Sequence, residues 1–196
     1  MRNRYHYRFI LLCLFSCTCW SLLAQDVQWA SEVIGYSSQY GNKDYSAQQV
    51  LGVPNALGAT NHYYMAWVPK RESSPTGEYI HVAFQNPMPI RQIAVAESLN
   101  PGAIHRIYLY DTQGNRSKIY ENKDPRGVLA PYRLFRHKFA LTDFDVAGAR
   151  IELRTRAVAG SNQIDAIGIS ASREPIRLQI NSVAYAAELG RPERLS

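Results

Sequence analysis

The sequence predicts an all-β fold, an antiparallel jelly-roll β-sandwich, and two observations support this prediction. Between residues 80 and 169, short apolar segments alternate with turn residues, and no segment there keeps the 3.6-residue period of a long helix. Many short strands at this spacing are typical of an antiparallel sandwich. About 170 of the 196 residues follow an apolar leader, which suits one domain with a substantial core.

The expected strands follow one another with short breaks. Segment 149–155 alternates most cleanly, with Ala149, Ile151 and Leu153 on one face and charged residues on the other. Residues 111–115 predict a hairpin turn, and the Asn-Pro-Met-Pro run at 86–89 is expected to interrupt a strand. Strands are expected at 79–84, 90–97, 103–110, 117–121, 132–139, 149–155 and 163–169.

The amino-terminal part of the sandwich is less regular. Residues 33–39 are expected to form an edge strand, and residues 46–51 one helical turn capped by Ser46. Residues 52–64 are expected to form a long loop. Trp67, which follows that loop, is expected in the core because a large aromatic side chain buries so much apolar area.

The two ends of the chain differ from this middle part. Residues 1–24 have the form of a secretory signal peptide, with three early arginines and an apolar run of about 15 residues, below the roughly 20 that span a bilayer. A membrane anchor, or a lipid anchor at Cys17, is the alternative. The sandwich then occupies residues 25–171, and residues 172–196 form a linker or the start of a truncated following region. This arrangement predicts a protein that is secreted or held in the cell envelope, in the periplasm or on the outer membrane surface.

Cysteine usage and charge narrow the class of partner. Cys13, Cys17 and Cys19 all lie in the leader, so the mature chain has no disulfide and no thiolate metal site, which suits a bacterial envelope. Removal of the leader's three arginines lowers the formal net charge from +6 to +3. That mild excess predicts no nucleic-acid partner. No transmembrane span is expected after cleavage of the leader.

Four motifs occur in a characteristic order along the chain. They are Ser-Ser-Gln-Tyr at 37–40, Leu-Gly-Val-Pro-Asn at 51–55, Asn-Pro-Gly-Ala-Ile at 100–104 and Asn-Gln-Ile-Asp-Ala-Ile-Gly-Ile at 162–169. Together they resemble the discoidin-like, galactose-binding-like β-sandwich domains. The chain is similar to the module at the front of a mitochondrial F-box and leucine-rich-repeat protein. It is also similar to the amino-terminal module of bacterial outer membrane protein A-like envelope proteins with β-propeller-like repeats.

This resemblance implies a non-catalytic binding module for carbohydrate or a cell-envelope polymer. The alternative is a structural or protein-interaction module that positions neighbouring domains of a larger envelope protein. An enzyme is not expected, because the sequence contains no Gly-x-Ser-x-Gly nucleophile motif, phosphate loop or dinucleotide fingerprint.

Two carboxylates are the first candidate site residues. Glu97 ends one expected strand and Asp165 begins another, so both lie at the same end of the sandwich if those strands pair antiparallel. Asp165 is expected on the same face as Ile167 and Ile169. The pair could hold calcium, which prefers carboxylate oxygens. The alternative is structural, with each carboxylate accepting hydrogen bonds from loop amides and Glu97 fixing the turn at 101–102.

Aromatic side chains supply the other candidates. Residues 36–67 contain many tyrosines among amide and hydroxyl side chains, a composition that suits sugar rings as well as a core. Tyr63 and Tyr64 follow a polar loop and are expected to be exposed. The predicted ligand-binding rim therefore consists of Tyr63, Tyr64, Glu97, Asn100 and Asp165. No cofactor other than a calcium ion at Glu97 and Asp165 is suggested.

A basic stretch at residues 116–138 is a further candidate. It could meet anionic glycans or lipid headgroups, but its cations fall on both faces of two expected strands. A solvated face is therefore the favoured interpretation.

Overall fold

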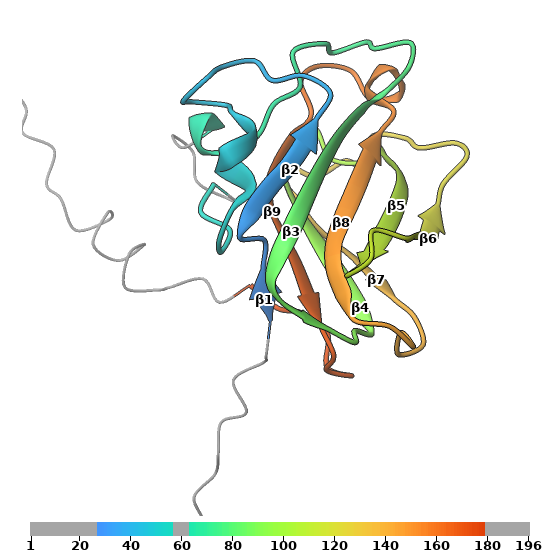
Figure 1. Cartoon of the computed structure of the whole chain (residues 1–196). Coiled ribbons are helices and arrows are strands. Elements are labelled where there is room, and N and C mark those ends of the chain that lie inside the picture. The colour runs from blue at the N-terminus through green and yellow to red at the C-terminus, as the bar shows by residue number, and fades with distance from the viewer. Residues whose placement is uncertain (1–26, 57–62, 179–196) are drawn as a thin grey trace, which may run out of the picture.

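The computed structural model describes residues 27–56 and 63–178, and these form a sandwich of two antiparallel sheets (Figure 1). The first sheet has the order β1 (Gln28–Trp29), β9 (Gln163–Ser170), β4 (Gln92–Leu99) and β7 (Arg133–Lys138). The second has the order β2 (Glu32–Tyr36), β3 (Glu78–Met88), β8 (Val146–Leu153), β5 (Ile104–Asp111) and β6 (Arg116–Glu121). The predicted all-β sandwich is confirmed.

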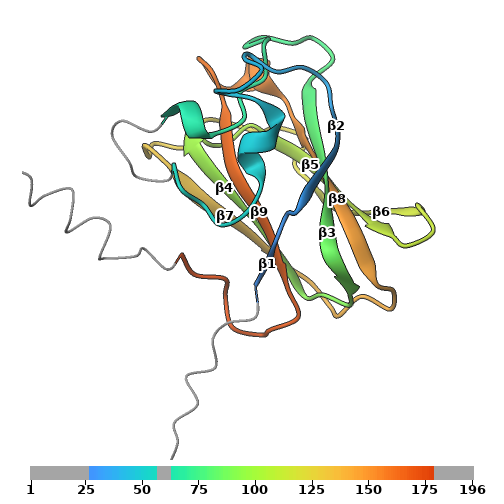
Figure 2. The ribbon, with the colours of Figure 1, turned by 60° about the vertical axis from the view of Figure 1, so that its left-hand side comes forward.

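The connections contain three short 3₁₀ turns, η1 (Ala47–Val50), η2 (Tyr63–Met65) and η3 (Thr155–Ala157). In Figure 2 the two sheets are seen apart, and η1 and η2 lie beside the four-stranded sheet. Among the described residues no helix is long and apolar enough to cross a membrane.

The sequence placed each of the seven main strands within a few residues. The largest difference is in β3, which continues through Pro87 because pairing with β8 resumes at Met88 opposite Val146 after an irregular stretch. A proline is tolerated at such a bulge because no ladder hydrogen bond is needed there. The expected cap at Ser46 is wrong, since its hydroxyl donates to the carbonyl of Lys43 (2.8 Å) and makes no capping bond to η1.

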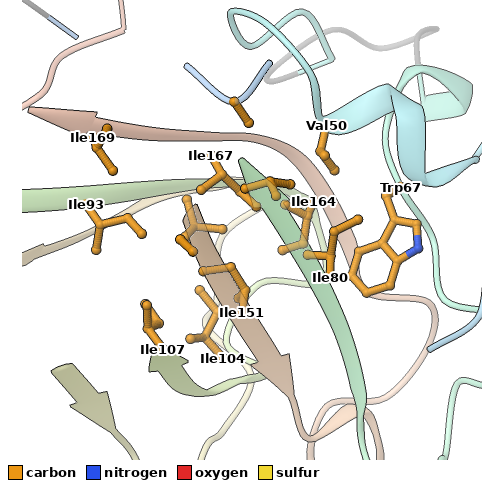
Figure 3. Close-up of a cluster of buried hydrophobic side chains, with 14 of the residues drawn as sticks. Val50, Trp67, Ile80, Ile93, Ile104, Ile107, Ile151, Ile164, Ile167 and Ile169 are labelled. Atoms are coloured by element: carbon orange, nitrogen blue, oxygen red, sulfur yellow. The ribbon is translucent and has the colours of Figure 1, made fainter. Parts of the chain in front are cut away.

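Alternating isoleucines from both sheets fill the space between them (Figure 3). Ile80 and Ile151 point inward from the five-stranded sheet, and Ile93 and Ile167 from the four-stranded sheet. Each is fully buried, so period-two alternation in the strands produces one continuous core. Trp67 closes one end of this core and is itself fully buried, as expected from the sequence.

Packing continues beyond the predicted domain boundary at residue 171. The Gln92 side chain donates to the carbonyls of Ser172 (2.7 Å) and Glu174 (2.6 Å), and it accepts from the amide of Ile176 (3.0 Å). Ile176 is fully buried. The first residues of the expected linker therefore belong to the sandwich. The predicted signal peptide, and the part of the tail after residue 178, lie outside the described residues.

The β5–β6 hairpin carries an ion-pair cluster with a consequence for acid stability. Lys118 Nζ (2.6 Å) and Arg106 Nε (2.7 Å) both donate to the Glu121 carboxylate, and these bonds lower the pKa of Glu121 from its usual 4.5 to about 2. A lowered pKa in the folded state means that the unfolded chain binds the proton first as the pH falls. The stabilisation by Glu121 is therefore present above pH 4.5 and is lost towards pH 2.

We expect Glu121→Gln to be less stable than the unmodified protein at pH 7 and equally stable near pH 2. Urea unfolding at a series of pH values measures this difference. Glu32→Gln serves as the control, because Glu32 is exposed and forms no ion pair among the described residues. A constant difference across the whole pH range would contradict the assignment.

Candidate functional site

The loops that follow β2, β4 and β8, and those that precede β3, β5 and β9, gather at one end of the sandwich. The pairing register requires this, since β4 runs antiparallel to β9 and β8 runs antiparallel to β3 and β5. This end is uppermost in Figure 1. Loop ends of a rigid sandwich are where binding residues are commonly presented.

A hollow of about 220 Å³ lies among these loops. We call it the aromatic pocket, and it is lined by Tyr40, Tyr45, Val68, Leu99, Ser161 and Gln163. Tyr40 is 68% exposed, and its ring meets that of Tyr45 edge-on with centroids 5.7 Å apart. One wall is therefore aromatic and open to solvent, while Ser161 and Gln163 line another part. The Ser161 hydroxyl donates to Glu72 Oε1 (2.5 Å), and Gln163 Oε1 accepts from the Ser98 hydroxyl (3.2 Å).

The backbone of Tyr45 adopts an uncommon conformation beside this pocket. Its φ angle is 57°, in the left-handed region that side-chain-bearing residues rarely occupy. Its amide donates to the Tyr64 carbonyl (2.9 Å), and its own carbonyl accepts from the Val68 amide (3.2 Å). The segment after Tyr64 is in turn paired with the start of β9 through Trp67 and Ile164. These bonds hold Tyr45 in place at a position where local strain must be overcome by the surroundings.

The polar side of this end is built around Asn100. Its Nδ2 donates to the Ser161 carbonyl (3.0 Å), and its backbone carbonyl accepts from Asn162 Nδ2 (2.7 Å). Gly160 has a φ of +83°, which favours glycine, and a Cβ there would lie 2.7 Å from Asn100 Nδ2 and would displace that side chain. Asn162 Oδ1 is buried and has no hydrogen-bond partner among the described residues. The loop carrying Ser161 is therefore fixed to the end of β4.

Glu97 lies at the same end of the sandwich as Asp165, as predicted, because β4 and β9 pair antiparallel there. Its Oε1 accepts from the Gly102 amide (2.8 Å), and its Oε2 accepts from Arg133 Nε (2.6 Å) and lies 2.5 Å from Arg133 Nη2 in an ion pair. Burial raises the pKa of Glu97, and the charge of Arg133 together with the Gly102 hydrogen bond opposes this only in part. Glu97 therefore fixes the turn at 101–102 and anchors β7.

Asp165 holds a different loop. Its two carboxylate oxygens accept from the amides of Asn55 (3.1 Å) and Ala56 (3.0 Å). The prediction that Asp165 shares a strand face with Ile167 and Ile169 is wrong. The register pairs Ala96 with Ala166 and Glu97 with Ile164, so Asp165 is the extra residue of a β-bulge. Ile164 takes the core position in its place.

These two carboxylates do not fit the expected calcium site. A guanidinium group lies 2.5 Å from Glu97 Oε2, where its charge would repel a cation, and the Asp165 oxygens face backbone N–H donors. Within the described part of the chain, no three His, Cys, Asp or Glu side chains are grouped as metal ligands. Glu97 and Asp165 are 2% and 1% exposed, so they lie beneath the predicted rim and position loops.

The other predicted site residues are distributed around the aromatic pocket. Tyr64 is 42% exposed and is bonded through its backbone to Tyr45, while Asn100 supports the Ser161 loop. The backbone of Tyr63 lies in η2, and its side chain is outside what the structure describes. Tyr40 and Tyr45 belong to the tyrosine-rich segment that the sequence singled out. Ser161 and Gln163 were missed, because nothing in their local sequence marks them as pocket residues.

This arrangement of two antiparallel sheets defines the chain as a galactose-binding-like β-sandwich. Residues 22–174 match the family model described as Pappalysin-1, SD scarf domain, C-terminal, and the chain belongs to that family. It is also similar to F-box/LRR-repeat protein 4 of Bos taurus, with 28% identity over 108 residues. That match covers 44% of this chain and 17% of the bovine protein, so the chain spans about a sixth of its curated relative.

Solved structures share the fold at low sequence identity. The family 32 carbohydrate-binding module of C. perfringens NanJ, in complex with galactose, has a TM-score of 0.51 and 17% identity, covering 73% of this chain and 98% of that module. The amino-terminal domain of the single-strand break repair protein XRCC1 has a TM-score of 0.51 and 10% identity, covering 73% and 98% respectively. At these identities the likeness establishes the fold. The resemblance to bacterial envelope proteins stays a prediction.

Proposed function

We propose that this protein is a non-catalytic carbohydrate-binding module whose sugar site is the aromatic pocket. The observation that carries the proposal is the solvent-exposed ring of Tyr40, set against Tyr45, in a hollow that Ser161 and Gln163 also line. We place the module outside the cytoplasm, secreted or in the cell envelope, as the leader expected at residues 1–24 implies.

The chemistry of the pocket suits a neutral sugar ring. The C–H face of a hexose is apolar and stacks on a tyrosine ring, whereas its hydroxyls need hydrogen-bond donors and acceptors close by. The pocket supplies both kinds of surface, and its volume of about 220 Å³ suits one or two sugar units better than a large ligand. A structure of the same fold that contains galactose supports the proposal.

The second candidate is a protein-interaction module that positions neighbouring domains. Exposed apolar side chains at other loops favour it, notably Leu129, which is fully exposed, and Val128 beside it. An interacting partner at that loop would leave the aromatic pocket free, so the two functions can be separated by mutation.

Replacing Tyr40 with alanine is expected to weaken glycan binding by about tenfold, the equivalent of losing about 1.4 kcal/mol of stacking and apolar contact. The melting temperature should stay nearly unchanged, because Tyr40 is 68% exposed. The measurement is binding of the full chain to an array of glycans and cell-wall polymers, with calcium and with chelator in parallel. Equal binding in both conditions is expected, since Glu97 and Asp165 do not fit calcium.

The matched control is Tyr132→Ala, which removes another exposed tyrosine that does not line the pocket. Binding should survive this change. The proposal would be overturned if Tyr40→Ala and Tyr132→Ala reduced binding equally. It would also be overturned if the folded protein bound no glycan on the array. Either result would favour the interaction module.

A further inference from the structure

A second hollow, of about 280 Å³, lies at the same end of the sandwich over the outer face of the five-stranded sheet. We call it the arginine pocket. Among its lining residues are four arginines, two glutamates and a tyrosine: Arg106, Arg150, Arg154, Arg156, Glu78, Glu152 and Tyr79. The register brings these together, since Glu152 of β8 pairs with Tyr79 of β3 on one side and Arg106 of β5 on the other.

Two of the four arginines are already paired with carboxylates. Arg150 lies 3.1 Å from Glu152 and stacks over the Tyr79 ring at 3.6 Å from its centroid. Arg106 lies 3.7 Å from Glu152 and 2.7 Å from Glu121. Both guanidinium groups are held by ion pairs within the sheet, so these residues form a structured wall.

Arg154 is held in place without a carboxylate. Its Nη1 donates to the Lys123 carbonyl (2.7 Å), and its Nη2 lies 3.4 Å from His105 Nε2. His105 Nδ1 faces the Asn122 carbonyl at 2.6 Å, so Nδ1 carries the proton and Nε2 accepts from Arg154. Two protein acceptors thus orient the guanidinium and leave its other N–H groups for a ligand.

Arg156 adds a second cation without a counter-ion. It is exposed in the middle of η3, two residues beyond Arg154. Across residues 27–56 and 63–178, neither Arg154 nor Arg156 forms an ion pair. The pocket therefore has two arginines without ion-pair partners beside a preassembled polar wall. The Glu78 carboxylate, which accepts from the Ser37 and Ser38 hydroxyls, lines the same pocket and reduces its net positive charge.

We infer that the arginine pocket binds a singly charged oxyanion carried on a sugar, either a uronate carboxylate or a sulfate ester. Guanidinium groups form strong charge-assisted hydrogen bonds to such oxygens. A single negative charge fits better than a dianionic phosphate, because the carboxylates of Glu78 and Glu152 also line the pocket. The choice of a sugar as carrier rests on the proposed function, whereas the oxyanion chemistry rests on the pocket itself.

The position of the pocket is compatible with one polymer reaching both sites. Arg156 lines the arginine pocket and Ser161 lines the aromatic pocket, and both belong to the connection between β8 and β9. Five residues of chain span at most roughly 18 Å, so the two Cα atoms lie within that distance. An acidic oligosaccharide of a few units can extend that far.

The test compares charged and neutral forms of the same polymer on the full chain. Polygalacturonate is paired with its methyl ester, and dextran sulfate with dextran, so that the two arms distinguish carboxylate from sulfate. We expect the charged member of at least one pair to bind more tightly than its neutral form. Arg156→Gln should weaken that binding by about tenfold, as expected for loss of one charge-assisted hydrogen bond.

Arg154→Gln should weaken binding at least as much. Arg156 is exposed, so Arg156→Gln should fold normally and keeps the test valid if Arg154→Gln fails to fold. The matched control is Arg173→Gln, which removes an exposed charge at the opposite end, near the start of β4. It should change affinity by less than about twofold, as is usual for a distant screened charge. Equal losses in Arg156→Gln and Arg173→Gln, or equal binding of charged and neutral polymers, would overturn the inference.

Tyr40→Ala in the same assay separates this inference from the proposed function. If the arginine variants lose acidic-polymer binding and Tyr40→Ala does not, the oxyanion site in the arginine pocket is supported and the sugar site in the aromatic pocket is wrong. If Tyr40→Ala loses all binding and the arginine variants lose none, the sugar site in the aromatic pocket is supported and the oxyanion site is wrong.

Discussion

Replacing Trp67 with alanine is expected to lower the free energy of unfolding by about 3–5 kcal/mol, the usual cost of truncating a large buried aromatic side chain. Trp67 is fully buried at the end of the core (Figure 3), and its Nε1 donates to the Ser38 carbonyl (3.0 Å). Its backbone also pairs with Ile164 at the start of β9. The substitution therefore opens a cavity and leaves a backbone acceptor without its donor.

Denaturant unfolding at pH 7 measures this loss. Trp67→Phe is the informative partner, because it keeps most of the apolar volume and removes the Nε1 donor; a smaller loss of about 1–2 kcal/mol is expected from it. A loss below about 1 kcal/mol for Trp67→Ala would place Trp67 outside the core, since surface changes rarely exceed roughly 0.5 kcal/mol.

Replacing Glu97 with alanine is the second large effect, with an expected loss of about 3 kcal/mol in unfolding free energy. The change removes the acceptor of the Gly102 amide and the partner of Arg133. The expected loss is at the low end of the range for broken buried pairs, because Arg133 is partly exposed and can turn its charge towards water. Gly102 itself has little freedom to adjust, since a Cβ there would lie 2.1 Å from the Arg126 carbonyl oxygen.

The pH dependence of this effect has a definite sign. Burial raises the pKa of Glu97, so the folded protein binds its proton more readily than the unfolded chain does. The contribution of Glu97 is therefore most favourable below its usual pKa and declines as the pH rises through the raised value. Gln carries no titrating proton at this position, so the free energy of unfolding of the unmodified protein should rise relative to that of Glu97→Gln as the pH falls through the raised pKa. A relative fall on acidification would contradict the raised pKa.

Period-two alternation made most of the fold predictable from the sequence. Ile80, Ile93 and Ile151 each face the core as expected, and the antiparallel order brought Glu97 and Asp165 to one end. The prediction failed at the bulge around Asp165, because a single extra residue inverts the faces of everything before it in the strand. No local sequence signal distinguishes such a bulge from a regular strand.

The binding residues were harder to predict because they are brought together by register. The tyrosine-rich segment indicated Tyr40 and Tyr45, but Ser161 and Gln163 lie more than a hundred residues later, in the connection before β9 and at the start of β9. The arginine pocket is a stronger example. The sequence drew attention to the basic stretch at 116–138, whereas the pocket's arginines without ion-pair partners among the described residues are Arg154 and Arg156, which are unremarkable as a local pattern.

The most direct test of the proposed sugar site is an NMR titration of the full chain, labelled with ¹⁵N, with a panel of neutral hexoses that includes galactose. We predict that at least one hexose shifts a contiguous set of amide signals at Tyr40, Tyr45, Ser161 and Gln163, and that about tenfold more hexose is needed to produce the same shifts in Tyr40→Ala. A folded protein whose signals at these residues stay unmoved by every hexose, or whose shifts fall elsewhere on the sandwich, would contradict the assignment of the aromatic pocket as a carbohydrate site.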